Sequence, residues 1–111
     1  MKKENILKSN REFNHIINNG QKFYNMYYVL YIEKSSIDQQ LFGFSVGTKI
    51  GNAVVRNKIR RQLKNIVQQR KTKGNFKCVV ITKRKIINLN YEDKEKYLID
   101  LLIKAGVINN E

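Results

Sequence analysis

The sequence predicts a single α+β domain over residues 1–111, in which helices pack against a β-sheet. Segments with apolar residues at three- and four-residue spacing alternate along the chain with segments rich in aromatic and β-branched residues. The chain has 111 residues, of which 41% are hydrophobic, and this suits one domain with one modest core. No apolar run is long enough to span a membrane, and the basic start carries no apolar signal segment, so we expect a cytoplasmic protein.

The first predicted element is a helix from about Asn10 to Asn19. Ser9 and Glu12 have the spacing of a capping box, in which two side chains satisfy backbone N–H groups at a helix start. Gly20 is expected to end this helix in the left-handed conformation, which costs glycine little. The apolar stripe of the helix consists of Phe13, Ile16 and Ile17.

Two strands are predicted next. Residues 22–33 favour one strand, with Asn25 marking the place where it could be interrupted. Alternation puts Tyr27, Val29 and Tyr31 on one face and Tyr28, Leu30 and Ile32 on the other. We expect one face to meet the core and the other to carry exposed aromatic rings. A second alternating segment at residues 41–47 follows a polar connection, and we expect the two strands to pair as a hairpin.

The second predicted helix begins after Asn52, a favourable N-cap residue, and has two contrasting sides. The apolar side consists of Val55, Ile59, Leu63, Ile66 and Val67. The other side has Arg56, Arg60 and Lys64 four residues apart, widened into a band by Lys58 and Arg61. One side is therefore expected to enter the core while the other presents cations.

The last part of the chain predicts a buried strand and a closing helix. Residues 76–82 are a continuous apolar run, which is typical of a strand covered on both faces, and the preceding helix suggests a strand–helix–strand crossover. Asn90 is predicted to cap the closing helix and Gly106 to end it. The apolar stripe of that helix consists of Leu98, Leu101, Leu102 and Ala105.

The net charge of +13 is concentrated in one segment. Between Asp38 and Glu92 there are thirteen lysines and arginines and no acid, whereas the nine bases elsewhere face nine acids. A polyanion is the natural partner of such a field, because each phosphate that a cation neutralises releases counterions. The alternatives are a solvated basic face and a membrane surface, but membrane binding needs a free apolar helix face, and the apolar faces here are required by the core.

No catalytic or metal-ligating constellation is visible in the sequence. The acids are peripheral, the single His15 has no partner and is expected on an exposed helix flank, and no glycine-rich run matches a phosphate loop. Cys78 lies within the apolar strand and is expected to be a buried small side chain. We therefore assign no catalytic residue and no metal ligand to the chain.

One stretch carries a family resemblance. Residues 51–61 read Gly-Asn-Ala-Val-Val-Arg-Asn-Lys-Ile-Arg-Arg, and with the strand before them they resemble the signature of the bacterial ribonuclease P protein subunit. The order of predicted elements is similar to that family over nearly the whole chain. The resemblance implies a single mixed β-sheet packed with helices, a ribosomal-protein-like fold in the order α-β-β(-β)-α-β-α, and a left-handed βαβ crossover. Without it, the common right-handed crossover would be expected.

The resemblance also implies a function. Ribonuclease P removes the 5′ leader from precursor tRNA, its catalytic subunit is an RNA that positions Mg²⁺, and the protein assists. The implied partners are ribonuclease P RNA and precursor tRNA, and neither a membrane nor DNA. Matching residue by residue places seven side chains against the catalytic RNA: Lys49, Arg56, Asn57, Lys58, Arg60, Arg61 and Lys64.

In the family the single-stranded leader runs through a cleft between the first helix and the sheet. Phe13, Ile17 and Tyr31 match its lining, and Asn25 and Tyr28 match the strand motif beside it. Base stacking on aromatic faces tolerates any sequence, which suits a variable leader. The chain departs from the family pattern at Ile17, where many relatives have an aromatic residue, and at Met26, Gly47 and Thr48, where polar or charged contacts are usual.

Two other functions compete with this interpretation. A non-enzymatic RNA-binding module such as a ribosomal protein would explain the basic segment and the fold equally well, and the signature around Arg56 to Arg61 discriminates in favour of ribonuclease P. A DNA-binding helix that reads a major groove with Arg56, Arg60 and Lys64 is the other, but the segment before Asn52 favours a strand rather than the first helix of a helix-turn-helix pair.

Overall fold

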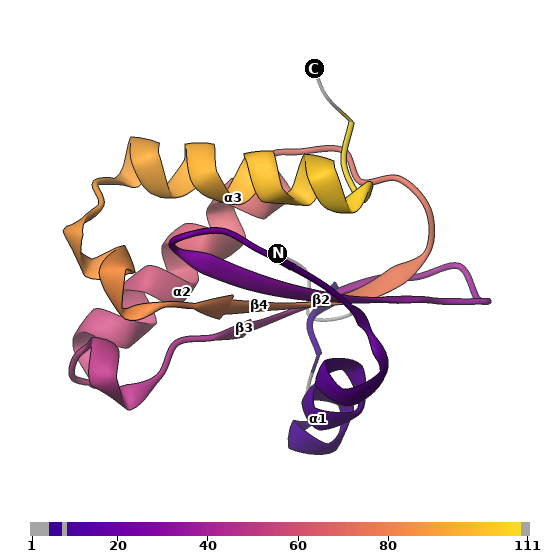
Figure 1. Cartoon of the computed structure of the whole chain (residues 1–111), viewed down its shortest axis with the longest axis horizontal. Helices are drawn as coiled ribbons and strands as arrows, with labels where there is room; N and C mark the ends of the chain where they lie inside the picture. The colour runs from indigo at the N-terminus through magenta and orange to yellow at the C-terminus, as the bar shows by residue number, and fades with distance from the viewer. Residues whose placement is uncertain (1–4, 8, 110–111) are drawn as a thin grey trace.

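The computed structural model describes residues 5–7 and 9–109, which form a four-stranded sheet with α-helices on both faces. The order along the chain is α1 (Asn10–Asn19), β1 (Gln21–Tyr24), β2 (Tyr28–Lys34), β3 (Gln40–Ser45), η2 (Thr48–Ile50), α2 (Ala53–Gln68), β4 (Phe76–Thr82), η3 (Arg84–Asn88) and α3 (Tyr91–Ala105). Helix α1 covers one face of the sheet, and α2 and α3 cover the other (Figure 1). The predicted α+β class with a single mixed sheet is confirmed.

The sheet has the strand order β1-β2-β4-β3, which corrects one prediction about pairing and settles where the segment at residues 22–33 is interrupted. The predicted strand at residues 22–33 is two antiparallel strands joined by a turn at Asn25. The predicted hairpin between residues 22–33 and 41–47 is wrong, because β4 lies between β2 and β3. Strand β4 pairs antiparallel with β2 and parallel with β3. As the most apolar strand, β4 takes one of the two central positions, where helices cover both of its faces.

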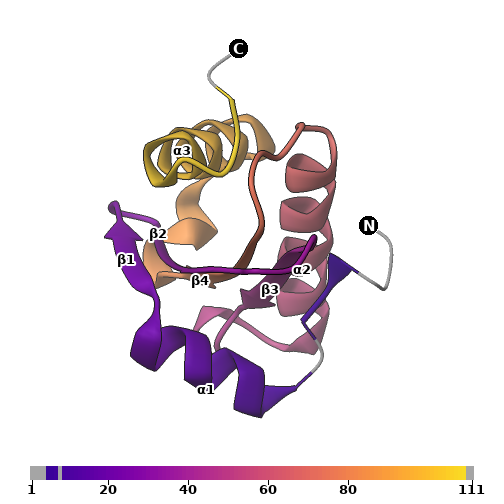
Figure 2. The ribbon, with the colours of Figure 1, turned by 90° about the vertical axis from the view of Figure 1, so that its right-hand side faces the viewer.

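The connection from β3 through α2 to β4 is the predicted crossover between parallel strands. Seen along the strands in Figure 2, β3 lies to the right of β4, and α2 lies above the sheet on the β3 side. Since β3 and β4 run away from the viewer and α2 returns, the connection is left-handed, as the resemblance implies and against the general preference.

The apolar residues form two layers, one on each face of the sheet. The larger layer lies between the sheet and helices α2 and α3 and includes Tyr28, Leu30, Ile32, Phe42, Phe44, Ile59, Leu63, Ile66, Leu98 and Leu102. The smaller layer lies under α1 and is built around Leu7, Ile16 and Val79. Both faces of β4 are therefore covered, as predicted, and Cys78 is a fully buried free thiol.

The helix caps largely agree with the sequence. The side chains of Ser9, Asn52 and Asn90 accept hydrogen bonds from backbone N–H groups three residues on, and Gly106 ends α3 in the left-handed conformation, with φ 78°. The prediction for Gly20 is wrong, since its backbone is extended. A Cβ at this position would lie 2.6 Å from the Ile16 carbonyl oxygen, so the close approach of α1's last turn requires glycine here.

Within the apolar stripe predicted for α2, one residue does not enter the core. Ile59, Leu63, Ile66 and Val67 are buried, but Val55 is 39% exposed. Val55 lies in the first turn of the helix, where it packs over Gly51 at the edge of the domain. The stripe therefore begins one turn later than the spacing predicts.

Candidate nucleic-acid interface

The cationic side of α2 is held outward by the burial of the opposite side. Asn57, Lys58 and Arg61 are exposed, and Arg56, Arg60 and Lys64 are half-buried along its flanks. Arg60 donates a hydrogen bond from Nη1 to Asn57 Oδ1 at 2.6 Å, and Arg56 donates from Nε to the Gly51 carbonyl oxygen at 3.2 Å. These two guanidinium groups are thereby oriented before any ligand binds, which reduces the entropy lost on binding.

Lys49 extends the cations beyond the helix. It lies in η2, is exposed, and is separated from the first turn of α2 by the short Gly51–Asn52 connection. The predicted RNA-contacting residues therefore form one surface along η2 and α2. We call this surface the basic band, and it consists of Lys49, Arg56, Asn57, Lys58, Arg60, Arg61 and Lys64.

A buried lysine that the sequence analysis missed lies behind the basic band. Lys94 of α3 is 8% exposed, and its Nζ donates a hydrogen bond to Gln62 Oε1 of α2 at 2.9 Å. Burial lowers the pKa of Lys94, and the nearby charge of Lys58 lowers it further. Because lysine is normally a surface residue, no sequence pattern pointed to it.

A cleft opens between α1 and the end of β3. Residues of three elements line it: Asn10, Phe13, Asn14 and Ile17 of α1, Phe44, Ser45 and Val46 at the end of β3, and Arg60 of α2. Its volume is about 500 Å³. The structure thus brings two predicted leader-binding residues, Phe13 and Ile17, to the same cleft as Arg60 of the basic band.

Two asparagines in this cleft were missed by the sequence analysis. Asn10 and Asn14 lie on the same side of α1 as Phe13 and Ile17. Their positions follow the spacing i, i+3, i+4, i+7 of one helix face, so helical periodicity applied to polar residues could have found them. Their amide groups add donors and acceptors to an otherwise apolar wall.

Phe13 is seated in the cleft by a glycine of the sheet. A Cβ on Gly43 of β3 would lie 2.3 Å from Phe13 Cζ, so the phenyl ring rests directly over the strand backbone. Tyr31 of β2 is half-buried and packs on the same apolar layer under α1. His15 is exposed, as predicted. Its Nε2 lies 2.9 Å from Glu33 Oε2, and this contact links α1 to β2.

The structure places the remaining two predicted leader-binding residues elsewhere. Tyr28 is fully buried on the opposite face of the sheet, and its hydroxyl donates to the Lys94 carbonyl oxygen at 2.9 Å. The prediction that Tyr28 contacts the leader is therefore corrected, because the side chain has no surface to offer. Burial also raises the pKa of Tyr28.

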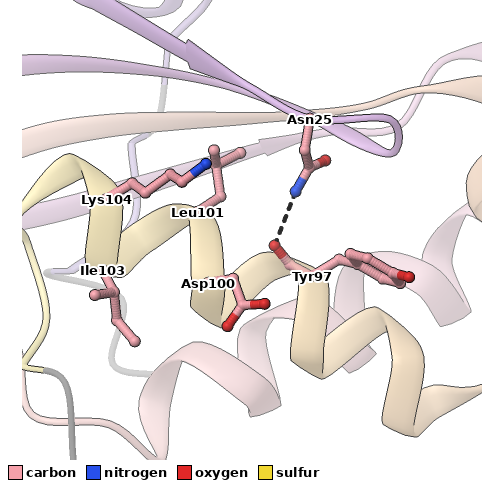
Figure 3. A pocket seen from close by; sticks show the side chains of 6 residues that line it. All are labelled: Asn25, Tyr97, Asp100, Leu101, Ile103 and Lys104. Atoms are coloured by element: carbon pink, nitrogen blue, oxygen red, sulfur yellow. Dashed lines mark hydrogen bonds between the residues drawn. The ribbon is translucent and has the colours of Figure 1, made fainter.

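Asn25 is likewise turned away from the α1 cleft. Its side-chain amide donates to the Tyr97 carbonyl oxygen of α3 at 3.0 Å, at the edge of a separate pocket lined also by Asp100, Leu101, Ile103 and Lys104 (Figure 3). Its Oδ1 accepts from the backbone N–H groups of Tyr27 and Tyr28, both at 2.9 Å. Asn25 thus shapes the β1–β2 turn and fixes it to α3.

The described part of the chain offers neither a metal-binding cluster nor a membrane-spanning helix. Within residues 5–7 and 9–109, no group of three or more His, Cys, Asp and Glu side chains is close enough together to hold a metal ion. No helix among those residues is long and apolar enough to cross a membrane.

Comparison with known proteins identifies the class to which this fold and basic band belong. A family model described as Ribonuclease P matches residues 1–106. Ribonuclease P protein components of Clostridium botulinum (strain 657 / Type Ba4) and Streptococcus agalactiae serotype III are 36% and 37% identical to the chain. These alignments cover 96% and 97% of the chain and 99% and 100% of the relatives.

Solved structures give the same result. The RNase P protein of Staphylococcus aureus superimposes with a TM-score of 0.87 at 29% identity, covering 96% of this chain and 100% of that one. The protein from Thermotoga maritima gives 0.82 at 28% identity, covering 88% and 94%. The chain belongs to the ribonuclease P protein family. It is a protein subunit of ribonuclease P, which implies an RNA partner and a role in tRNA processing.

Proposed function

We propose that this subunit binds the catalytic RNA through the basic band and holds the 5′ leader of precursor tRNA in the α1 cleft. The observation that carries the proposal is the meeting of Phe13, Ile17 and Arg60 in one cleft. Apolar side chains contact unpaired bases, and a guanidinium at the same place neutralises the phosphates that join them. The protein thereby assists removal of the leader to give the mature 5′ end.

The cleft combines apolar and polar side chains, and this combination suits a single-stranded RNA leader of variable sequence. Phe13 offers an aromatic ring over the Gly43 backbone, and Ile17 offers an aliphatic contact one turn along α1. Neither side chain can form a hydrogen bond with a base edge, so neither prefers one base. Asn10 and Asn14 supply polar contacts to sugar or phosphate on the same wall.

The basic band supplies the longer contact with the catalytic RNA. Lys58 and Arg61 are exposed, so they can reach phosphates without breaking a contact within the protein. Arg60 lies at the boundary, since it belongs to the band and also lines the cleft. Through Arg60 the two RNA partners would approach each other on one side of the protein.

Mg²⁺ enters this proposal as a cofactor of the RNA subunit. Mg²⁺ prefers oxygen ligands in octahedral geometry and, when bound, stabilises charge on the reacting phosphate. The described residues provide no acidic cluster that fits such an ion, so no step is assigned to a metal held by the protein. What the protein contributes is binding and orientation of the substrate in the cytoplasm.

The test is single-turnover cleavage of precursor tRNA by a bacterial ribonuclease P RNA at near-physiological Mg²⁺, with and without this protein. We expect strong acceleration by the protein, and loss of most of it when the leader is trimmed to one nucleotide. Acceleration that is independent of leader length would contradict the leader cleft. Tight, salt-sensitive RNA binding without acceleration would instead support the ribosomal-protein alternative.

A further inference from the structure

An exposed aromatic ring lies on the α1 face of the sheet, outside the cleft already described. Tyr24 ends β1 and is 67% exposed. In the register of the sheet, Tyr24 lies opposite Val29 of β2, and Val29 lies opposite Ile81 of β4. Ile81 in turn lies opposite Ser45 of β3, which lines the cleft. Cross-strand partners share a face, so these four residues form one row across the sheet. With strands about 4.8 Å apart, Tyr24 lies roughly 14 Å from Ser45 along this row.

The row is open because α1 covers only part of this face. Val79 of β4 is fully buried under α1, whereas Ile81, two residues further along the same face, is only half-buried. Figure 1 shows the β1–β2 turn at the end of the sheet away from α1. Val29 and Ser45 are also half-buried. A ligand that leaves the cleft at Ser45 therefore meets accessible side chains all the way to Tyr24.

Two lysines flank the Tyr24 ring. The Nζ atoms of Lys22 and Lys83 lie 5.7 Å and 5.4 Å from its centroid. Lys83 is fixed by a hydrogen bond from Nζ to the Asn25 carbonyl oxygen at 2.6 Å, whereas Lys22 is exposed at the sheet edge. No ion pair found within the described residues takes up either ammonium group.

We propose that Tyr24, Lys22 and Lys83 bind one nucleotide of the precursor tRNA leader beyond the α1 cleft. This inference rests on the function proposed above. The base stacks on the Tyr24 ring, and Lys22 moves from the ring to the adjoining phosphate while Lys83 holds the ring in place. An exposed ring next to unneutralised cations suits a nucleotide, since it offers both a stacking surface and countercharge. A partner protein without negative charge would leave both ammonium groups without a countercharge.

The test measures the affinity of the holoenzyme for precursor tRNAs whose leaders lengthen one nucleotide at a time. We expect Tyr24→Ala to weaken binding roughly fivefold for leaders long enough to cross the sheet, and to leave shorter leaders unchanged. Tyr24→Phe keeps the ring and should keep the affinity. Lys22→Ala should reduce the salt dependence by about one phosphate, again only for long leaders. Met26→Ala is the matched control, because Met26 is 57% exposed on the same hairpin.

The outcomes separate this inference from the function on which it rests. If the unaltered protein shows no dependence on leader length, the leader function itself fails. If that dependence is present but Tyr24→Ala shifts all leaders equally, or behaves like Met26→Ala, the Tyr24 site is wrong and the cleft stands. As a direct probe, 2-aminopurine placed along the leader should be quenched at one position, with quenching lost in Tyr24→Ala and kept in Tyr24→Phe.

Discussion

Asn25 shows how a single residue can match a functional motif and serve the fold instead. Its side chain takes part in three hydrogen bonds, two that form the β1–β2 turn and one that reaches α3. We expect Asn25→Ala to lower the free energy of unfolding by about 2–3 kcal/mol, since each bond contributes about 1 kcal/mol. We also expect the affinity for leaders that fill only the α1 cleft to stay unchanged. Urea denaturation and precursor binding measure the two effects.

The control for this prediction is Asn25→Asp, which keeps the acceptor for the turn and loses the donor to Tyr97. It should retain the turn and show a smaller loss of stability. A variant of Asn25 that folds with undiminished stability but binds leaders confined to the α1 cleft more weakly would show that this side chain does contact the leader.

The sequence predicted which residues of β2 share a face better than it predicted which helix covers each face. Period-two alternation correctly separated Tyr31 from Tyr28 and Leu30. It was wrong for Tyr27, which precedes β2 in the turn and packs on the α3 side against Tyr97. It could not say that Tyr28 faces the α3 side, because both faces of β2 are apolar and both are covered by helices. The motif match at Tyr28 therefore marked a core residue that anchors α3 through its hydroxyl.

At the scale of elements, helices could be predicted from local sequence and strand pairing could not. The caps at Ser9, Asn52 and Asn90 act within a few residues, and the structure confirms them. Besides β1, strand β2 pairs with β4, which lies more than forty residues away in sequence, and no local pattern encodes that choice. The chain turns at Asn25 to form the β1–β2 hairpin, and the apolar β4 is buried between β2 and β3. The hairpin between β2 and β3 that their closeness in sequence favoured therefore does not form.

The basic band of α2 makes a prediction about salt. Lys58 and Arg61 are exposed on the band, and if they contact phosphates their removal eliminates two counterion-releasing contacts. We expect the double variant Lys58→Ala, Arg61→Ala to bind ribonuclease P RNA more weakly and to reduce the salt slope by about two phosphates. Filter binding across a series of salt concentrations measures this slope.

The matched control removes the same charge from α3. Lys96 and Lys104 are exposed on that helix, so Lys96→Ala with Lys104→Ala gives the same net charge as the band variant. If both double variants change the slope equally, the effect is one of net charge and the band is not a contact surface. A change confined to the α2 variant supports direct phosphate contacts.

At the scale of the whole molecule, composition and charge predicted the partner better than they predicted the topology. The segment between Asp38 and Glu92 carries the whole net charge, and the structure distributes its cations over η2, α2, the following loop, β4 and η3. The left-handed crossover follows from the family resemblance alone, because the physical rule favours the opposite hand. The cleft forms only where α1, the end of β3 and α2 meet. It therefore depends on tertiary structure and could not be predicted from any one segment.

The stability of the whole fold should depend on pH through the buried thiol of Cys78. Burial raises the pKa of this thiol in the folded protein, whereas in the unfolded chain it ionises near its usual value of about 8.5. Above that pH the unfolded state binds fewer protons than the folded state, so the free energy of unfolding falls as pH rises. We expect this loss to reach about 2 kcal/mol at pH 10 for the Cys78 contribution alone.

Cys78→Ala isolates that contribution. The variant leaves a small cavity, which costs a similar amount at every pH, and it removes the ionising group. Tyr28, with its raised pKa, and Lys94, with its lowered pKa, remain in both proteins, so their effects cancel in the difference. Urea denaturation under reducing conditions at pH 7 and pH 10 should show the gap between the two proteins narrowing or reversing at the higher pH. A gap that stays constant would mean that the thiol is accessible to water in the folded state and that the core around β4 is looser than its burial indicates.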